Sequence, residues 1–103
     1  MVNIILYLNL KSDAEAIIKE LLQLKLVAHA SIDVDNQSYS LENEKLIQQV
    51  NFVVTAQTKA MLFGSIETFI QEKYSDTVKI FSMPITQCNS AFFDYIAENT
   101  TKI

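Results

Sequence analysis

The sequence passes twice through the same order of elements: a strand-like segment, an amphipathic helix and a second strand-like segment. The first cycle spans Val2 to Leu10, Ser12 to Leu26 and Val27 to Ser38, and the second spans Leu46 to Gln57, Thr58 to Lys73 and Thr77 to Gln87. The outer segments alternate apolar and polar residues, whereas the helical ones repeat apolar residues every three or four positions. Two such cycles in 103 residues predict a single α+β domain, a ferredoxin-like βαββαβ sandwich with two helices on one face of an antiparallel sheet.

Local signals mark where the two helices begin. Ser12, followed three residues later by Glu15, predicts a capping box for the first helix. Thr58 has a residue type that caps helices, so we expect it to cap the second. Gly64 falls inside the second helix, where it costs about 1 kcal/mol relative to alanine, and we interpret it as a close-packing point. The strand residues expected to face the helices are Ile4, Leu6, Leu8, Leu10, Ala28, Ala30, Ile32, Val34, Val50, Phe52, Val54 and Ala56.

Three further segments complete the predicted fold. Asn36 and Gln37 begin a stretch that we expect to be a protruding hairpin with a charged, solvated tip. It carries Tyr39, Leu41, Glu42, Asn43 and Glu44. Because Pro84 cannot donate a backbone hydrogen bond, the strand from Val78 to Ile85 is predicted at a sheet edge or a bulge. After Asn89 or Ser90, the apolar residues Phe92, Phe93 and Ile96 predict a short C-terminal helix.

Composition narrows the classes of function. Half of the residues are apolar, the net charge is −4, and all eight basic residues are lysines. Because arginine is the usual bidentate partner of phosphates and guanine edges, its absence argues against nucleic-acid binding. No apolar stretch reaches the roughly 18 residues that a membrane span needs, so we expect no membrane insertion. The single cysteine, Cys88, suits a reducing compartment, and we expect a cytoplasmic protein.

One face of the predicted sheet mixes polar and apolar side chains. It is the face turned away from the helices, and its members are Ile5, Tyr7, His29, Ser31, Asp33, Gln49, Asn51, Val53, Thr55, Gln57, Phe81 and Met83. A lone protomer would leave this partly apolar patch in water, and large patches of that kind usually mark interfaces. We therefore expect neighbouring subunits to cover this face.

Several short stretches, taken in their order along the chain, resemble the CutA family of divalent-cation tolerance proteins. They are Leu26 to Ile32 after the first helix, Gln57 to Lys59 before the second, Phe63 within it, Ser82 to Ile85, Asn89, and Tyr39 and Glu42 in the hairpin. The resemblance covers essentially the whole chain. It implies a ferredoxin-like fold, a tight homotrimer that is topologically similar to PII signalling proteins, and a role in tolerance of metal ions such as copper.

The sequence departs from the family pattern at residues that have been connected with metal. His29 stands where the family often has a cysteine that has been linked to copper. The segment from Lys73 to Asp76 takes the place of a His-Pro-Tyr-Glu signature, and Leu41 takes the place of a hairpin tryptophan. The resemblance therefore implies the fold and the trimer more directly than it implies a metal site.

His29 and Asp33 are the candidate metal ligands. His29 is the only histidine and shares a strand face with Asp33. An imidazole and a carboxylate suit copper or zinc, and three copies near a symmetry axis would add ligands. Four residues along a strand span about 13 Å, however, which is too far for both side chains to bind one ion. We rank first the alternative, an interface histidine held by hydrogen bonds, because one histidine seldom makes a metal site.

A second group of residues suggests a ligand cleft between subunits. Tyr39, Glu42, Lys73 and Asp76 offer a phenol, two carboxylates and an ammonium group. They support an alternative function, a PII-like signalling or scaffold trimer that binds a small anionic metabolite or a partner protein. The charges of the hairpin suit a solvated loop tip equally well.

Catalysis has little support in the sequence. There is neither a nucleophile elbow nor a glycine-rich phosphate loop, and no pair of nucleophile and base can be named. Cys88 would need an electropositive neighbourhood to be reactive, and a small residue near a turn is its simpler role. We therefore expect a non-enzymatic protein and rank a hydrolase on the same fold last.

Overall fold

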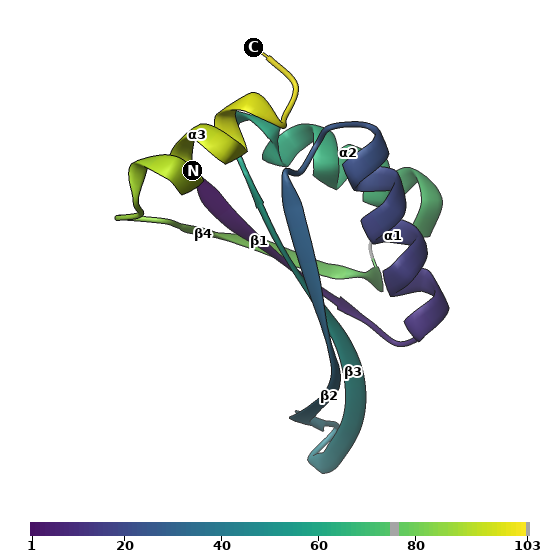
Figure 1. Ribbon diagram of the computed structural model, residues 1–103. Helices are drawn as coiled ribbons and strands as arrows, with labels where there is room; N and C mark the ends of the chain where they lie inside the picture. The colour runs from purple at the N-terminus through teal and green to yellow at the C-terminus, as the bar shows by residue number, and fades with distance from the viewer. Residues whose placement is uncertain (75–76, 103) are drawn as a thin grey trace.

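The computed structural model describes residues 1–74 and 77–102 and has the predicted order of elements (Figure 1). These are β1 (Val2–Leu8), α1 (Lys11–Gln23), β2 (His29–Glu42), β3 (Lys45–Thr58), the 3-10 helix η1 (Ala60–Leu62), α2 (Phe63–Tyr74), β4 (Lys79–Pro84) and α3 (Ser90–Glu98). The strands form one antiparallel sheet in the order β2-β3-β1-β4. The predicted α+β sandwich with a C-terminal helix is therefore confirmed.

The core lies between one face of this sheet and the helices α1 and α2 (Figure 1). Ile4 and Leu6 of β1 are fully buried there, in one cluster with Val54 of β3, Ile17 of α1 and Ile66 of α2. Each such side chain contributes about 1.5–3 kcal/mol when it leaves water. This apolar layer holds the helices on the sheet and leaves the opposite face without them.

β2 and β3 continue past the helices as a two-stranded ribbon, in which residues 36–42 pair with residues 45–51 (Figure 1). We call this ribbon the hairpin arm; it is the protruding hairpin that the sequence predicts. Val34 and Val50, which were expected in the core, are 48% and 52% exposed. That expectation is wrong because alternation along a strand does not show where the covering helices end.

The start of α1 differs from the predicted capping. The helix begins at Lys11, directly after the extended residue Leu10, and no side chain caps it. The predicted capping box of Ser12 and Glu15 is wrong because Ser12 already lies inside the first helical turn. Leu10, expected in the core, is exposed because β1 ends at Leu8.

Two expectations for α2 are also wrong, whereas the expected start of α3 is confirmed. Thr58 is the buried last residue of β3, and its hydroxyl donates to the carbonyl of Leu26 at 2.6 Å instead of capping a helix. A Cβ added at Gly64 would meet nothing within 4 Å, so no segment packs closely there. Asn89 caps α3, because its side chain accepts a hydrogen bond from the Phe92 backbone N–H.

The two remaining elements lie at the margins of the sheet. β4 is an edge strand that carries Pro84, as predicted. α3 lies at the end of the sheet where β1 begins (Figure 1), with Ile96 fully buried and the Tyr95 hydroxyl donating to the Ala28 carbonyl at 3.3 Å. Among the described residues, no helix has the length and apolar character needed to cross a membrane.

Candidate functional site

The sheet face turned away from α1 and α2 carries both candidate metal ligands. Strand pairing arranges its side chains in rows that run across all four strands. The rows are His29, Gln57, Asn3 and Met83; then Ser31, Thr55, Ile5 and Phe81; then Asp33, Val53, Tyr7 and Lys79. We call this surface the outer face. It remains partly apolar in water, because Phe81 and Met83 are 42% and 45% exposed.

His29 is the first residue of β2, and its ring lies exposed at the start of the first row. Its Nδ1 is 2.9 Å from Oε1 of Gln57, and Nε2 of Gln57 donates to Oδ1 of Asn3 at 3.0 Å. Both hydrogen bonds join residues that are backbone register partners, His29 with Gln57 and Gln57 with Asn3. A chain of three polar side chains therefore crosses β2, β3 and β1.

Asp33 lies two rows away from His29 on the same strand. At the usual rise of a strand, four residues span about 13 Å, so the structure does not bring the two side chains to one ion. Within residues 1–74 and 77–102, no group of three or more histidine, cysteine, aspartate or glutamate side chains could hold a metal. Within the described part of one protomer, His29 therefore belongs to no such three-ligand group.

Tyr39 and Glu42 lie on the hairpin arm but on opposite faces of it. Tyr39 pairs with Gln48 in the middle of the arm and is 60% exposed, whereas Glu42 pairs with Lys45 beside the turn. Because side chains alternate along a strand, residues three apart point to opposite sides. The structure therefore does not bring these two predicted cleft residues together within one protomer.

Glu42 instead lines a cleft of about 420 Å³ between the hairpin arm and the body of the protein. The lining is mostly polar and consists of Tyr7, Leu8, Asn9, Leu10, Asp13, Glu42, Gln49, Asn51, Tyr74, Thr77, Val78 and Lys79. The charged groups among these residues are two carboxylates, Asp13 and Glu42, and one ammonium group, Lys79. The charged groups of this lining are therefore more acidic than basic.

Asn51 is the least expected member of this cleft. It is only 5% exposed, and its Nδ2 donates to the Ser38 hydroxyl, which in turn donates to Asn36 at 3.2 Å. Sequence reasoning missed the cleft role of Asn51, Asp13 and Lys79. Polar residues that alternate along a strand are usually solvent-exposed, so nothing in the pattern signals a buried amide.

Lys73 lies on the helical side of the molecule and outside the cleft lining. Its ammonium group contacts Glu20 of α1 at 2.5 Å and lies 5.3 Å from the centre of the Phe69 ring. The hydrogen bond to Glu20 raises the pKa of Lys73 above its ordinary value. Burial raises the pKa of its neighbour Tyr74, which does line the cleft. Asp76, the fourth predicted cleft residue, lies outside the described residues.

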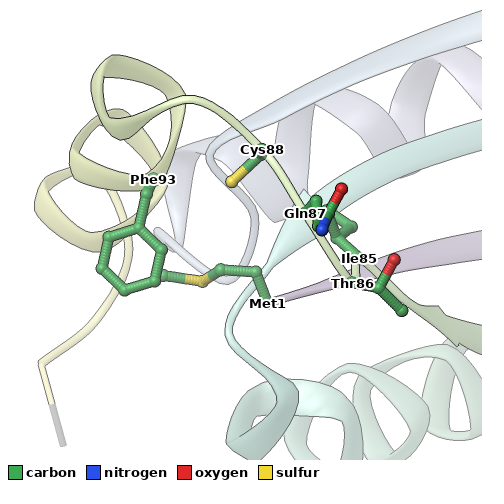
Figure 2. Close-up of a pocket in the computed structure, with 6 residues that line it drawn as sticks. All are labelled: Met1, Ile85, Thr86, Gln87, Cys88 and Phe93. Carbon is green, nitrogen blue, oxygen red and sulfur yellow. The ribbon is translucent and has the colours of Figure 1, made fainter.

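Cys88 is exposed and lines a second pocket, of about 710 Å³, beside the start of β1 (Figure 2). Figure 2 shows the pocket among Met1, Ile85, Thr86, Gln87, Cys88 and Phe93. These six residues include no basic side chain that would stabilise a thiolate. The sequence-based interpretation of Cys88 as a small residue near a turn is consistent with this environment.

Comparison with known proteins gives a family match and several similar structures. Residues 3–99 match the family model described as CutA1 divalent ion tolerance protein. No curated protein sequence matches the chain.

The similar solved structures extend over almost the whole chain. CutA1 from Pyrococcus horikoshii superposes with a TM-score of 0.88 at 19% identity, covering 99% of this chain and 100% of that one. CutA1 from Oryza sativa gives 0.90 at 13% identity, with 99% and 94% covered. The periplasmic divalent cation tolerance protein CutA from Archaeoglobus fulgidus gives 0.84 at 26% identity, with 96% and 98% covered.

Proposed function

The chain belongs to the CutA1 divalent ion tolerance protein family, and from that premise we propose that it is a homotrimer that binds a divalent metal ion through His29. The observation that carries the proposal is the position of this side chain. His29 is exposed, is oriented by Gln57, and lies on a face whose apolar residues a lone protomer leaves in water.

The exposed apolar side chains support the trimer. Phe81 and Met83 lie at the β4 edge of the outer face, and the hairpin arm adds Tyr39, Leu41, Leu46 and Val50. Transfer of apolar surface out of water contributes roughly 25 cal/mol per Å². Contacts among copies of this chain would remove these side chains from water, and such contacts are the expected role of the arm.

The donor set fits a metal ion only when several protomers contribute. Imidazole is a good ligand for copper and zinc, and divalent copper binds most tightly in the first transition series. One His29 supplies one nitrogen, so a complete site would use His29 from three protomers, with Asp33 as the nearest further carboxylate on the same strand. We propose copper as the preferred ion and zinc as the competitor.

Calorimetric titration of the purified protein with copper(II) and with zinc tests the metal half of the proposal. We expect saturable copper uptake by the unchanged protein and its loss in the His29→Ala variant. Asp33→Asn is the matched control on the same strand, and it should weaken binding less than His29→Ala does. Equal copper uptake with and without His29 would reject the assignment.

We assign no reaction to the protein, and we propose a cytoplasmic location. Tolerance of an ion requires binding and not turnover, in keeping with a family of divalent ion tolerance proteins. A free, exposed thiol at Cys88 suits a reducing compartment.

The cleft beside the hairpin arm supports a second candidate function, a PII-like signalling trimer that responds to a small molecule. Its two carboxylates and one ammonium group suit a small zwitterion or amine. A thermal-shift screen of amino acids, polyamines and nucleotides tests this function. Stabilisation by an amine that disappears in Glu42→Gln, while copper binding is unchanged, would favour it over metal binding.

A further inference from the structure

We propose that Gln57 is a positioning residue that sets the tautomer of His29 and thereby selects which ring nitrogen can bind metal. The inference rests on the proposed function and deepens it at the same site. In this arrangement the Gln57 carbonyl oxygen accepts a hydrogen bond from Nδ1–H of His29. A neutral imidazole carries one proton, so Nε2 keeps its lone pair and is the nitrogen left for an ion.

Asn3 engages the nitrogen end of the Gln57 amide. Nε2 of Gln57 donates to Oδ1 of Asn3 at 3.0 Å. Once the amide nitrogen is engaged on the β1 side, the amide oxygen is the end that faces His29, 2.9 Å away. A side-chain carbonyl can only accept, so the ring nitrogen at that distance must be the one that carries the proton.

The backbone holds these side chains in place. Gln57 lies between its register partners His29 and Asn3. The backbone carbonyl of Gln57 accepts a hydrogen bond from the Ala28 N–H at 2.9 Å. The hydroxyl of the next residue, Thr58, donates to the backbone carbonyl of Leu26. Leu26 and Ala28, which precede β2, are therefore both bonded to β3, and these bonds fix the backbone next to His29.

If the hydrogen bonds from Asn3 through Gln57 to His29 ran in the opposite direction, the other ring nitrogen would carry the proton. If Asn3 presented its NH2 group to Gln57, the Gln57 amide would reverse and donate to Nδ1 of His29. The ring proton would then lie on Nε2, and that nitrogen could not bind metal. In metal proteins the ligating histidine commonly donates its other N–H to an acceptor, which is the direction that the structure shows.

The first test reads the tautomer in the metal-free protein. Long-range ¹H–¹⁵N correlation spectra of protein labelled at histidine distinguish the two tautomers at about pH 9, above the range in which histidine ordinarily changes charge. We expect the Nδ1–H form in the unchanged protein and its loss in Gln57→Leu, which removes the acceptor at similar volume. Gln48→Leu, on the same strand but hydrogen-bonded to Gln37, is the matched control and should leave the spectrum unchanged.

The second test measures copper affinity in the same variants. Loss of the acceptor should weaken binding roughly tenfold in Gln57→Leu, and Gln57→Glu should retain affinity because its carboxylate still accepts from Nδ1–H. Circular dichroism checks that each variant folds. If Gln57→Leu does not fold, Asn3→Ala tests the same set of hydrogen bonds, because it removes the acceptor of the Gln57 amide nitrogen.

The outcomes separate the two proposals. An Nε2–H tautomer in the unchanged protein, or Gln57→Leu with unaltered tautomer and affinity, would overturn the role of Gln57. The expected tautomer without copper uptake in any variant would support Gln57 as the residue that orients the ring and reject the metal-binding function instead.

Discussion

Thr58 shows how a single buried hydroxyl can join two elements. It donates at 2.6 Å to the Leu26 carbonyl in the segment before β2. In Thr58→Val that carbonyl loses its donor at nearly constant volume, so we expect the free energy of unfolding to fall by about 1–3 kcal/mol. Thr58→Ser keeps the hydroxyl and should cost only about 1 kcal/mol for the lost methyl. Urea titrations measure both, and equal losses would contradict the importance of the hydrogen bond.

Gly64 is a position where the protein is not optimised for stability. It lies in α2 without a positive φ, and a Cβ there meets no atom within 4 Å. Gly64→Ala should therefore raise the free energy of unfolding by about 0.5–1 kcal/mol, because alanine loses less chain entropy on folding. Ala91→Gly, an exposed position in α3, is the reverse control and should lower stability by a similar amount. Destabilisation by Gly64→Ala would show that the space is occupied.

At the scale of residues, both helix caps predicted from the sequence are wrong. The sequence predicts that the last helix starts after Asn89 or Ser90, and only the structure shows that Asn89 caps it. Ser12 and Thr58 have equally suitable side chains, yet Ser12 lies one position inside its helix and Thr58 ends a strand. Capping depends on backbone geometry at one residue, and periodicity locates element ends only to within a few residues.

At the scale of an element, the turn of the hairpin arm contains backbone strain. Asn43 and Glu44 both have positive φ, 51° and 65°, in a two-residue hairpin loop. Such a loop is a type I′ turn, for which Asn-Gly is preferred. Glu44→Gly should relieve roughly 1 kcal/mol of strain, so amide hydrogen exchange in residues 36–42 and 45–51 should slow about fivefold. Lys45→Gly, one residue later in the strand, should speed exchange; slower exchange there too would argue against the turn as the cause.

The ion pair between Glu20 and Lys73 links α1 to α2 and makes stability depend on alkaline pH. The hydrogen bond from Glu20 raises the pKa of Lys73, and burial raises the pKa of Tyr74. A pKa raised in the folded state gives stability that is complete below the unfolded value and is lost as the pH rises through the folded value. We therefore expect the urea midpoint to fall above about pH 10.

The matched variants for this pair are Glu20→Gln and Glu15→Gln. Glu20→Gln should lower the urea midpoint at pH 8, and its difference from the unchanged protein should narrow as Lys73 loses its proton. Glu15→Gln removes the exposed pair with Lys11, in which the charged groups are 3.9 Å apart, and should have little effect. A constant difference between Glu20→Gln and the unchanged protein up to pH 11 would count against the linkage.

Element types follow from the sequence, but their lengths do not. The periods of two and of about 3.6 residues identify the strands and the two main helices, and Pro84 identifies the edge strand. The length of the hairpin arm and the register shift between Asp33 and Asn36 are not encoded in a period. They depend on where α1 and α2 end above the sheet, which is a property of tertiary packing.

At the scale of the whole molecule, assembly is the property to test first. We expect sedimentation velocity at micromolar concentration to show a trimer. Phe81→Lys should convert the trimer to folded protomers, because it places a charge among the exposed apolar residues of the outer face. Met61→Lys alters an even more exposed apolar residue, on η1 and away from the outer face, and should leave the trimer intact. An unchanged sedimentation coefficient for Phe81→Lys would show that this residue is not needed for assembly.

The candidate site is only partly readable from the sequence. His29 is conspicuous as the single histidine, and alternation places it on the outer face. Its link to Gln57 and Asn3 spans 28 and then 54 positions along the chain, and only the strand register reveals it. Lys73, which the sequence suggests as a cleft residue, is paired in the structure with Glu20, 53 positions away, and only the packing of α1 beside α2 reveals that contact.

The order of the strands also affects the protein before it assembles, because it leaves β2 at an edge of the sheet. β2 runs for 14 residues along one margin of the sheet, and β3 pairs with one side of it only. Its other side offers a row of backbone donors and acceptors that can template the addition of another strand. A newly made protomer therefore exposes a long edge strand, and aggregation through that edge competes with correct assembly until the edge is covered.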